Sequence, residues 1–243
     1  MFRARSRRDE CYPVSTSAVI PIKQLENAKQ RLAPILDTGE RNNFFRAMVE
    51  DVLTAVEACT LVDEIVVVTR DPVVADLALS YEAEILDEPD NAGLIPSVSK
   101  AAGCLANKGT NVMMFLPGDV PLVTPEELEI VLEGFGRQAG AEFMIVPASD
   151  LGGSNCIACS PPDCMEFEFG ENSFRRHLAI SRRLDIEPCV AKLPGIGLDV
   201  DTPEDLAELS RILMESRLES NTHRYIRESG IMERMLEDFQ KIG

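Results

Sequence analysis

Apolar residues along the chain follow two spacings, one typical of strands and the other typical of helices. Short runs rich in β-branched and apolar residues predict strands. These runs cover residues 18–22, 64–69, 84–86, 111–116, 142–147 and 156–160. Between 39 and 59 the apolar positions recur every three or four residues, which predicts a helix, and shorter helices are predicted over 72–80 and 94–106. Strands that alternate with helices require crossover connections, so the pattern predicts a three-layer α/β/α fold with a mainly parallel sheet.

Two further helices have clear start signals in the sequence. Thr124 and Thr202 are each followed by Pro, then by acidic residues in the first turn. A threonine cap, a proline at the first helical position and an acid at the third are typical of helix N-termini. No repeat, low-complexity tract or linker interrupts the pattern, so we expect one domain over residues 14–218.

The two ends of the chain are expected to lie outside that domain. Residues 1–13 are rich in arginine and are interpreted as a disordered extension. Residues 219–243 are interpreted as a helical tail, with the helix running from 221 to 239. Its apolar positions, which could dock on the domain or on a second subunit, are Ile226, Met232, Met235, Leu236 and Phe239. On that basis we expect a homodimer.

The charge balance limits the partners of the chain. With 24 Lys and Arg against 41 Asp and Glu, the net charge is −17. A surface this negative repels nucleic-acid backbones and anionic membranes, so neither is an expected partner. The longest apolar runs are strand-sized and far shorter than a membrane helix. Seven cysteines, several in apolar surroundings, are typical of reduced core thiols, which favours a cytoplasmic protein.

Three cations form a local exception within this acidic chain. Lys23, Lys29 and Arg31 fall within nine residues after the first predicted strand. Ligands of open α/β sheets bind beyond the carboxyl ends of the strands, so these side chains are candidates to hold a phosphate. A solvated basic loop is the alternative. Because neither G-x-G-x-x-G nor a P-loop motif occurs, a phosphate grip here has to come from side chains.

Three aspartates are candidates for a metal site. Asp119 follows the strand predicted over 111–116, whereas Asp199 and Asp201 precede the Thr202 cap. Each is also compatible with a simple turn or capping role. Clustered carboxylates with no Lys or Arg beside them need a neutralising cation, and Mg²⁺ prefers carboxylates together with substrate phosphates. Combined with the basic segment, the aspartates predict a nucleoside triphosphate site.

Two further segments are candidates to bind a small anionic substrate. Ser154 follows a Gly-Gly pair, and its segment could instead be a plain hairpin turn. Ser173 lies where a helix is expected to open, and free amides at such a start bind carboxylate or phosphate. The next polar positions, Arg175, Arg176 and His177, are compatible with solvated helix residues.

Together these segments resemble the 2-phospholactate guanylyltransferase (CofC) family, which contributes to coenzyme F-420 assembly. The matching stretches extend over residues 18–210. They are 19–23 with 28–32, 118–122, 152–155, 169–177 and 199–206. The resemblance implies a nucleotide-diphospho-sugar-transferase-like fold and magnesium held by Asp119, Asp199 and Asp201. It also implies that Ser154, Gly170 and Ser173 contact a phosphorylated hydroxy- or enol-acid.

The implied reaction joins GTP to (2S)-2-phospholactate and gives lactyl-2-diphospho-5'-guanosine and pyrophosphate. A phosphate monoester is mostly dianionic at neutral pH, so its oxygen can attack the α-phosphorus without a general base. Lys23, Lys29, Arg31 and Asp119 are then the candidate catalytic residues. The alternatives are a phosphoenolpyruvate guanylyltransferase, a molybdenum-cofactor or sugar-phosphate nucleotidyltransferase, and a module that senses GTP without turnover.

Overall fold

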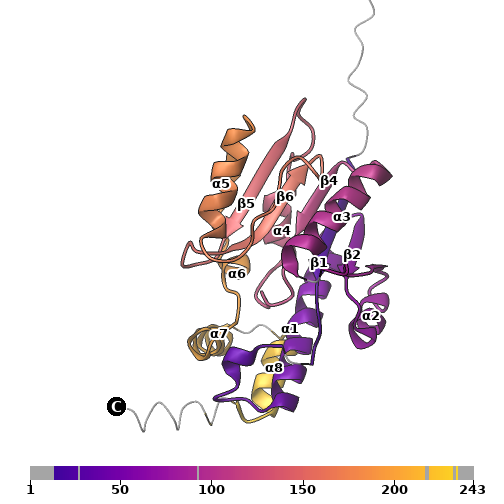
Figure 1. Cartoon of the computed structure of the whole chain (residues 1–243). Helices are drawn as coiled ribbons and strands as arrows, with labels where there is room; N and C mark the ends of the chain where they lie inside the picture. Colours follow the sequence, from indigo (N-terminus) through magenta and orange to yellow (C-terminus); the bar gives the residue numbers. More distant parts are fainter. Residues whose placement is uncertain (1–13, 27, 92, 217–218, 232–233, 235–243) are drawn as a thin grey trace, which may run out of the picture.

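The structure is a computed structural model that describes residues 14–26, 28–91, 93–216, 219–231 and 234. Its described strands form a single sheet in the order β3-β2-β1-β4-β6-β5-β7 (Figure 1). The strands are β1 (Thr16–Pro21), β2 (Glu64–Val68), β3 (Glu84–Leu86), β4 (Val112–Phe115), β5 (Glu142–Pro147), β6 (Ser154–Ser160) and β7 (Pro188–Val190). The helices are η1 (Gln30–Leu32), α1 (Thr38–Ala58), α2 (Pro72–Leu79), α3 (Leu94–Lys108), α4 (Pro125–Leu132), α5 (Ser173–Arg183), α6 (Pro194–Gly197), α7 (Pro203–Glu215) and α8 (Asn221–Glu228).

The sheet is mixed but mainly parallel. β1 pairs in parallel with β2 and β4, β2 with β3, and β5 with β7. Only β6 runs against its neighbours, β4 and β5, among the strands that the structure describes. The antiparallel direction of β6 follows from the short connection between β5 and β6, which closes a hairpin. The expected fold class is confirmed.

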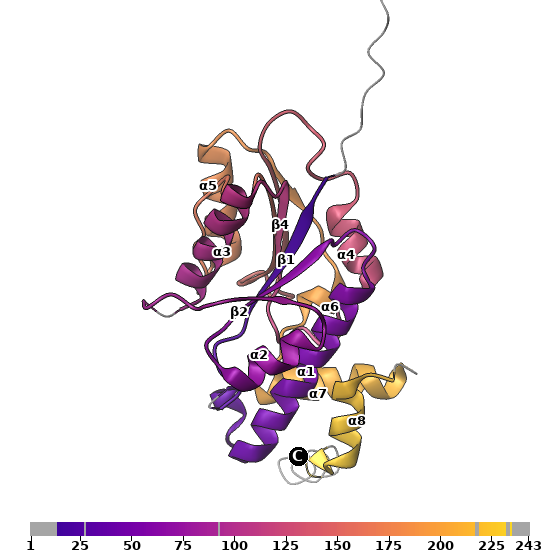
Figure 2. The ribbon, with the colours of Figure 1, turned by 90° about the vertical axis from the view of Figure 1, so that its right-hand side faces the viewer.

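Side chains of alternating strand positions build two separate cores, one on each face of the sheet. Ala18 and Ile20 of β1 pack on the face that α1, α2 and α4 cover, whereas Val19 packs under α3. Figure 2 shows this division, with α3 and α5 on one side of the sheet and α1 and α4 on the other. Strands buried on both faces explain the nearly continuous apolar runs in the sequence.

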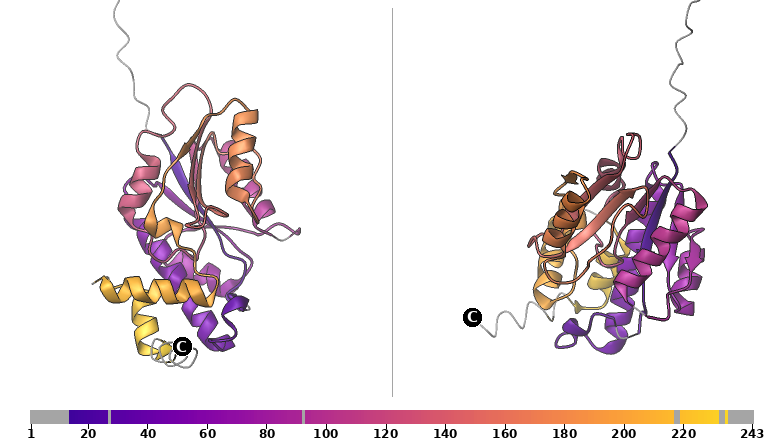
Figure 3. Two further views of the ribbon diagram at one scale, coloured as in Figure 1. Left: turned by 90° about the vertical axis from the view of Figure 1, so that its left-hand side faces the viewer. Right: turned by 45° about the horizontal axis from the view of Figure 1, so that its top comes forward.

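A third apolar cluster lies beyond the sheet, where α7 and α8 pack against the first half of α1. It includes Phe44 of α1, Leu209 of α7 and Ile226 of α8, all fully buried. Figure 3 shows α7 and α8 together at one end of the molecule, next to α1. Ile226 therefore packs within its own chain.

The helix expected over 221–239 is wrong in its extent. α8 ends at Glu228, Ser229 caps it, and Gly230 follows with a φ of 66°. A left-handed glycine directly after the last turn is a common helix stop. Met232, Met235, Leu236 and Phe239 lie outside the described residues.

A carboxylate of α1 holds the start of α8. Asp51 accepts hydrogen bonds from the backbone N–H groups of Asn221 and Thr222, at 2.7 and 2.9 Å, and is largely buried. These are two of the amide groups that a helix cannot satisfy internally. The contact spans 170 residues of sequence and fixes α8 on the domain.

We expect Asp51→Ala to lower the free energy of unfolding by about 1–2 kcal/mol, as the loss of a helix-capping group does. Asp51→Asn keeps one acceptor oxygen and is expected to lose about half as much. Urea denaturation measures the difference, with Glu57→Ala, an exposed position on the same helix, as the control. Equal stabilities for Asp51→Ala and Glu57→Ala would contradict this role.

The two predicted helix starts are confirmed. The Thr124 side chain accepts from the N–H of Glu127, and Thr202 forms a reciprocal capping box with Asp205. The second cap also places Asp201, since the Asp205 carboxylate accepts from the Asp201 N–H at 3.0 Å. Among the helices that the structure describes, none has the length and apolar character of a membrane-spanning helix.

Candidate active site

The predicted site residues gather at one edge of the sheet. β1 runs from the amino end of the domain toward α7 in Figure 1, and the parallel strands β2 and β4 end at the same edge. Lys29 lies in the loop after β1, and Asp119 lies in the loop after β4. Asp199 and Asp201 lie between α6 and α7. Because β6 is antiparallel, its first residue, Ser154, also belongs to this edge.

Lys29 lies between two of the aspartates. Its Nζ is 2.5 Å from Asp119 Oδ2 and 2.7 Å from Asp201 Oδ1, and its side chain is only 5% exposed. Arg31 reaches Asp201 more loosely, at 3.8 Å. The aspartates were expected to lack a basic neighbour, and that expectation is wrong. Lys29 is 90 residues from Asp119 and 172 from Asp201, so the neighbour is provided by the fold.

Opposite charges outweigh burial in this cluster. Burial alone would lower the pKa of Lys29, but the carboxylates of Asp119 and Asp201 raise it above its ordinary value. Burial works to raise the pKa of Asp201, whereas Lys29 and Arg31 bring it below the ordinary value. Lys29 and Asp201 are therefore both charged at neutral pH.

Asp199 is in a different environment from Asp201. Burial raises its pKa, and the negative charges of Asp119 and Asp201 add to that effect. Asn155 opposes it by donating from Nδ2 to Asp199 Oδ1 at 3.0 Å. The same Nδ2 donates to the carbonyl of Ile196. No pattern in the sequence indicated that Asn155 holds an aspartate of the site.

The loop that carries Asp199 is fixed by close backbone contacts. Gly195 approaches Leu122 so closely that a Cβ there would lie 2.2 Å from the Leu122 carbonyl oxygen. The Glu127 carboxylate accepts from the N–H groups of Gly195 and Ile196, at 2.8 and 2.9 Å. Val200 N–H donates to the Asp119 carbonyl at 3.0 Å. A glycine is thus required where the two aspartate loops meet.

The three aspartates provide carboxylate oxygens, the ligand type that Mg²⁺ prefers. Within the described residues, no three Asp, Glu, His or Cys side chains are arranged to hold an ion as they stand. The Lys29 ammonium group lies between two of the carboxylates instead. A metal held by Asp119 and Asp201 would therefore have to displace the Lys29 ammonium group.

A second polar cluster contains the residues expected to bind the acid. Ser154 Oγ lies 3.1 Å from Ser173 Oγ, and both residues are buried. Gly170 precedes the start of α5 with a φ of 104°, and its carbonyl accepts from the Ser173 N–H. Phe174 N–H donates to the Gly152 carbonyl. The expected free amides at this helix start are therefore not available at Ser173 and Phe174, and the hydroxyl groups remain.

His177 is not a solvated helix residue. It is completely buried, with Nδ1 3.0 Å from Ser154 Oγ and Nε2 3.0 Å from the N–H of Glu168. Burial, reinforced by the nearby charge of Arg176, lowers its pKa to about 4. His177 lies four residues after Ser173, so the two side chains share one face of the helix. That spacing was the signal in the sequence that could have indicated the burial of His177.

The two clusters meet at consecutive residues of β6. Ser154 joins the hydroxyl pair, and Asn155 holds Asp199. Neighbouring strand residues point to opposite faces, so one short stretch of β6 supports both clusters.

Lys23 is exposed in the loop after β1 and pairs with none of the described acids.

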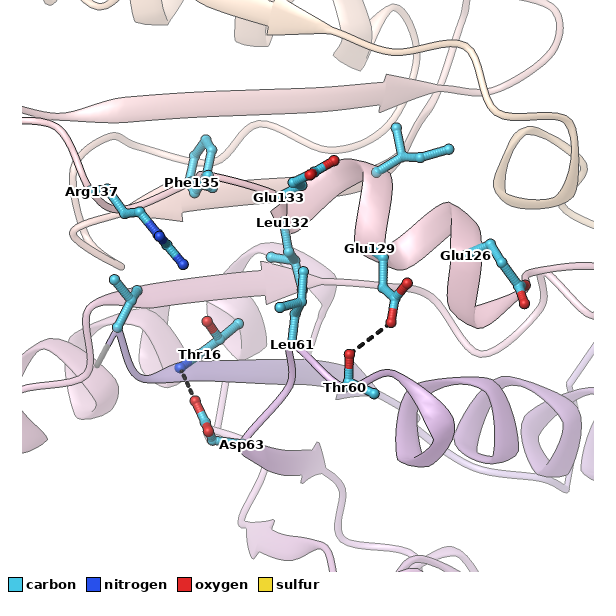
Figure 4. A pocket seen from close by; sticks show the side chains of 13 residues that line it. Thr16, Thr60, Leu61, Asp63, Glu126, Glu129, Leu132, Glu133, Phe135 and Arg137 are labelled. Carbon is cyan, nitrogen blue, oxygen red and sulfur yellow. Dashed lines mark hydrogen bonds between the residues drawn. The ribbon is translucent and has the colours of Figure 1, made fainter. Parts of the chain in front are cut away.

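A large cavity lies at the other end of the sheet. Its volume is about 760 Å³, and its lining includes Thr16, at the start of β1, and Asp63, just before β2 (Figure 4). Three glutamates, Glu126, Glu129 and Glu133, also line it, with Arg137. None of the predicted site residues contributes to this cavity. Carboxylates outnumber cations in its lining, so the cavity repels the negative charge of a triphosphate.

Comparison with known proteins identifies the family of the chain. The sequence profile of the family described as "Guanylyl transferase CofC like" matches residues 16–237. The chain belongs to the CofC family. The CofC chain is 36% identical to a phosphoenolpyruvate guanylyltransferase of Conexibacter woesei over 204 residues, 84% of this chain and 91% of the relative. It is 30% identical to a 2-phospho-L-lactate guanylyltransferase of Methanobrevibacter smithii, with 86% and 88% of the chains covered.

Other relatives of this CofC chain carry different names or share only its fold. A 3-phospho-D-glycerate guanylyltransferase of Colwellia psychrerythraea is 30% identical, with 80% of this chain and 91% of the relative covered. A solved structure from Desulfovibrio desulfuricans G20, described as a nucleotide-diphospho-sugar transferase, has a TM-score of 0.75 at 18% identity. It covers 91% of this chain and 98% of its own. This CofC protein is therefore a guanylyltransferase-type nucleotidyltransferase with the expected fold.

Proposed function

We propose that this protein transfers the guanylyl group of GTP to the phosphate of a small phosphorylated hydroxy- or enol-acid and releases pyrophosphate. The observation that carries the proposal is the pairing of two clusters on β6. One cluster joins Lys29 to Asp119 and Asp201 and includes Asp199, which Asn155 of β6 holds. The other joins Ser154 of β6 to Ser173. The first suits a triphosphate and its metal, and the second suits a small anion.

The reaction requires that the two phosphorylated reactants are aligned and that their negative charge is neutralised, and it depends less on proton transfer. The acid's phosphate oxygen forms a bond to the α-phosphorus of GTP, and the bond to the pyrophosphate oxygen breaks. A phosphate monoester is already mostly dianionic at neutral pH, so no base has to be found. This agrees with a site whose nearest histidine, His177, is buried and neutral.

Each charged side chain has a role in this proposal. Asp119, Asp199 and Asp201 would hold Mg²⁺, which supplies positive charge against the triphosphate when bound. Lys29 would then be free to contact phosphate oxygens, a contact that Arg31 and the exposed Lys23 could also make. Ser154, Gly170 and Ser173 hold the acid, so the two reactants meet at the start of β6.

Two acids are the leading substrates. Phosphoenolpyruvate is favoured by the name of the relative at 36% identity, and (2S)-2-phospholactate by the relative at 30%. Both carry a phosphate on the carbon next to a carboxylate. With 2-phospholactate the product is lactyl-2-diphospho-5'-guanosine, an intermediate in the assembly of coenzyme F-420.

The test is a pyrophosphate-release assay with purified protein and Mg²⁺. GTP, ATP, CTP and UTP are each combined with phosphoenolpyruvate, 2-phospholactate, 3-phosphoglycerate or a sugar 1-phosphate, and the conjugate is identified by mass spectrometry. We expect pyrophosphate only with GTP and one or more of the three acids. Turnover with the sugar phosphate alone would overturn the proposal, as would GTP binding with no product from any acceptor.

A further inference from the structure

His177 connects two segments that border the hydroxyl pair. It lies in α5, its Nδ1 contacts Ser154 at the start of β6, and its Nε2 contacts the Glu168 backbone. The ring of Phe169 packs against it with the centroids 5.2 Å apart. A completely buried imidazole with a partner on each nitrogen is held in one orientation.

The contacts of the ring define its tautomer. The Glu168 N–H is a donor only, so Nε2 must present a lone pair to it. The single ring proton of the neutral imidazole is therefore on Nδ1. The ring thus donates toward Ser154 Oγ.

This tautomer determines where the hydroxyl protons can point. Ser154 and Ser173 have one hydroxyl proton each, and one of the two is used in the bond between them. Because Nδ1 already bears a proton, the Ser154 hydroxyl cannot donate to the ring. One hydroxyl proton of the pair therefore remains for a third partner. With the opposite tautomer, Nδ1 would accept that proton and none would remain.

We propose that His177 is a positioning residue that keeps one hydroxyl proton of the Ser154–Ser173 pair directed at an anionic oxygen of the acid substrate. This rests on the proposed function, because it assumes that the pair binds the acid. An anionic oxygen accepts only, and a hydrogen bond to it is about twice as strong as one between neutral groups. The pair so oriented favours a carboxylate or phosphate oxygen as its occupant.

A matched pair of variants tests the role of Nδ1. In His177→Gln the side-chain amide reaches the position of Nε2 and can still accept from Glu168, but no donor faces Ser154. In His177→Asn the amide nitrogen takes the position of Nδ1 and restores that donor. We expect His177→Gln to raise KM for phosphoenolpyruvate about tenfold with KM for GTP unchanged. His177→Asn is expected to remain within about threefold of the wild type for both substrates.

Nitrogen-15 NMR of the histidine side chains provides a readout that does not depend on turnover. We expect His177 to be protonated on Nδ1, and its Nδ1 signal to shift when phosphoenolpyruvate is added. Protonation on Nε2, an unshifted signal, or equal KM changes in the two variants would overturn the inference. If the wild type makes no conjugate with any acid, the proposed function fails. The tautomer and the shift on adding phosphoenolpyruvate then decide the inference on their own.

Discussion

Asp119→Asn is expected to lower kcat/KM for guanylyl transfer by a factor on the order of 10³, close to abolition, with the fold intact. The substitution keeps the size of the side chain but removes a negative charge that faces Lys29 at 2.5 Å. It also removes a carboxylate that would hold the metal. Because Asp201 still pairs with Lys29 at 2.7 Å and the Asp119 loop is held through its backbone carbonyl, the melting temperature should fall only modestly and the protein should remain folded.

Pyrophosphate release at saturating Mg²⁺ measures the effect, and circular dichroism checks the fold. Asp63→Asn is the matched control, because Asp63 lines the cavity at the amino end of the sheet and its carboxylate accepts from the Thr16 N–H. We expect Asp63→Asn to retain turnover within about threefold. Near-normal turnover in Asp119→Asn, or its loss in Asp63→Asn, would move the active site away from Asp119.

Most of the fold was predictable because the spacing of apolar residues in each segment matches the way that segment packs in or against the sheet. Each face of the sheet is covered by helices, so buried strands appear as apolar runs, and the long helix α1 has a regular apolar spacing. The short elements β7 and α6 were missed. β7 has three residues, two of them exposed, and α6 has four, too few for either spacing to appear.

The residues that form the site were predictable from the sequence, but the contacts between them were not. The positions after strands indicated Lys29 and Asp119, since strand ends meet at one edge of an α/β sheet. That Lys29 inserts between Asp119 and Asp201 depends on loops 90 and 172 residues apart. Lys29 also has a φ of 52°, an uncommon backbone conformation for a lysine that no sequence pattern indicated. Long-range electrostatic pairs of this kind are set by the fold.

Residues that support the site were not predictable from the sequence for a related reason. Asn155 and His177 act on other residues of the site, and each is buried inside a regular element. In a strand or a helix such positions have the same spacing as core residues. Only the polar partner beside it in the structure shows that such a side chain supports the site as well as filling the core.

Lys29→Met is expected to have two opposite effects, a loss of turnover and a gain in metal affinity. Removing the ammonium group leaves Asp119 and Asp201 unneutralised, which should lower the free energy of unfolding by about 1–3 kcal/mol in the absence of metal. This is less than the ~3–5 kcal/mol for a fully buried pair, because the two acids are 23% and 44% exposed. Turnover should fall at least about 100-fold, since Lys29 no longer reaches the phosphates.

Thermal denaturation with increasing Mg²⁺ separates these effects. The melting temperature of Lys29→Met should rise toward that of the wild type as Mg²⁺ replaces the missing charge, whereas the wild type without nucleotide should respond weakly. Lys29→Arg keeps the charge, so it should lose less stability than Lys29→Met. A planar guanidinium fits a buried site that holds a compact ammonium group poorly, so turnover should still fall. Lys23→Met, at an exposed lysine that forms no ion pair with the described residues, should leave both the stability and its response to Mg²⁺ unchanged. If Lys29→Met binds Mg²⁺ no better than the wild type, Lys29 does not compete with a metal for these carboxylates. The metal site would then have to involve other groups.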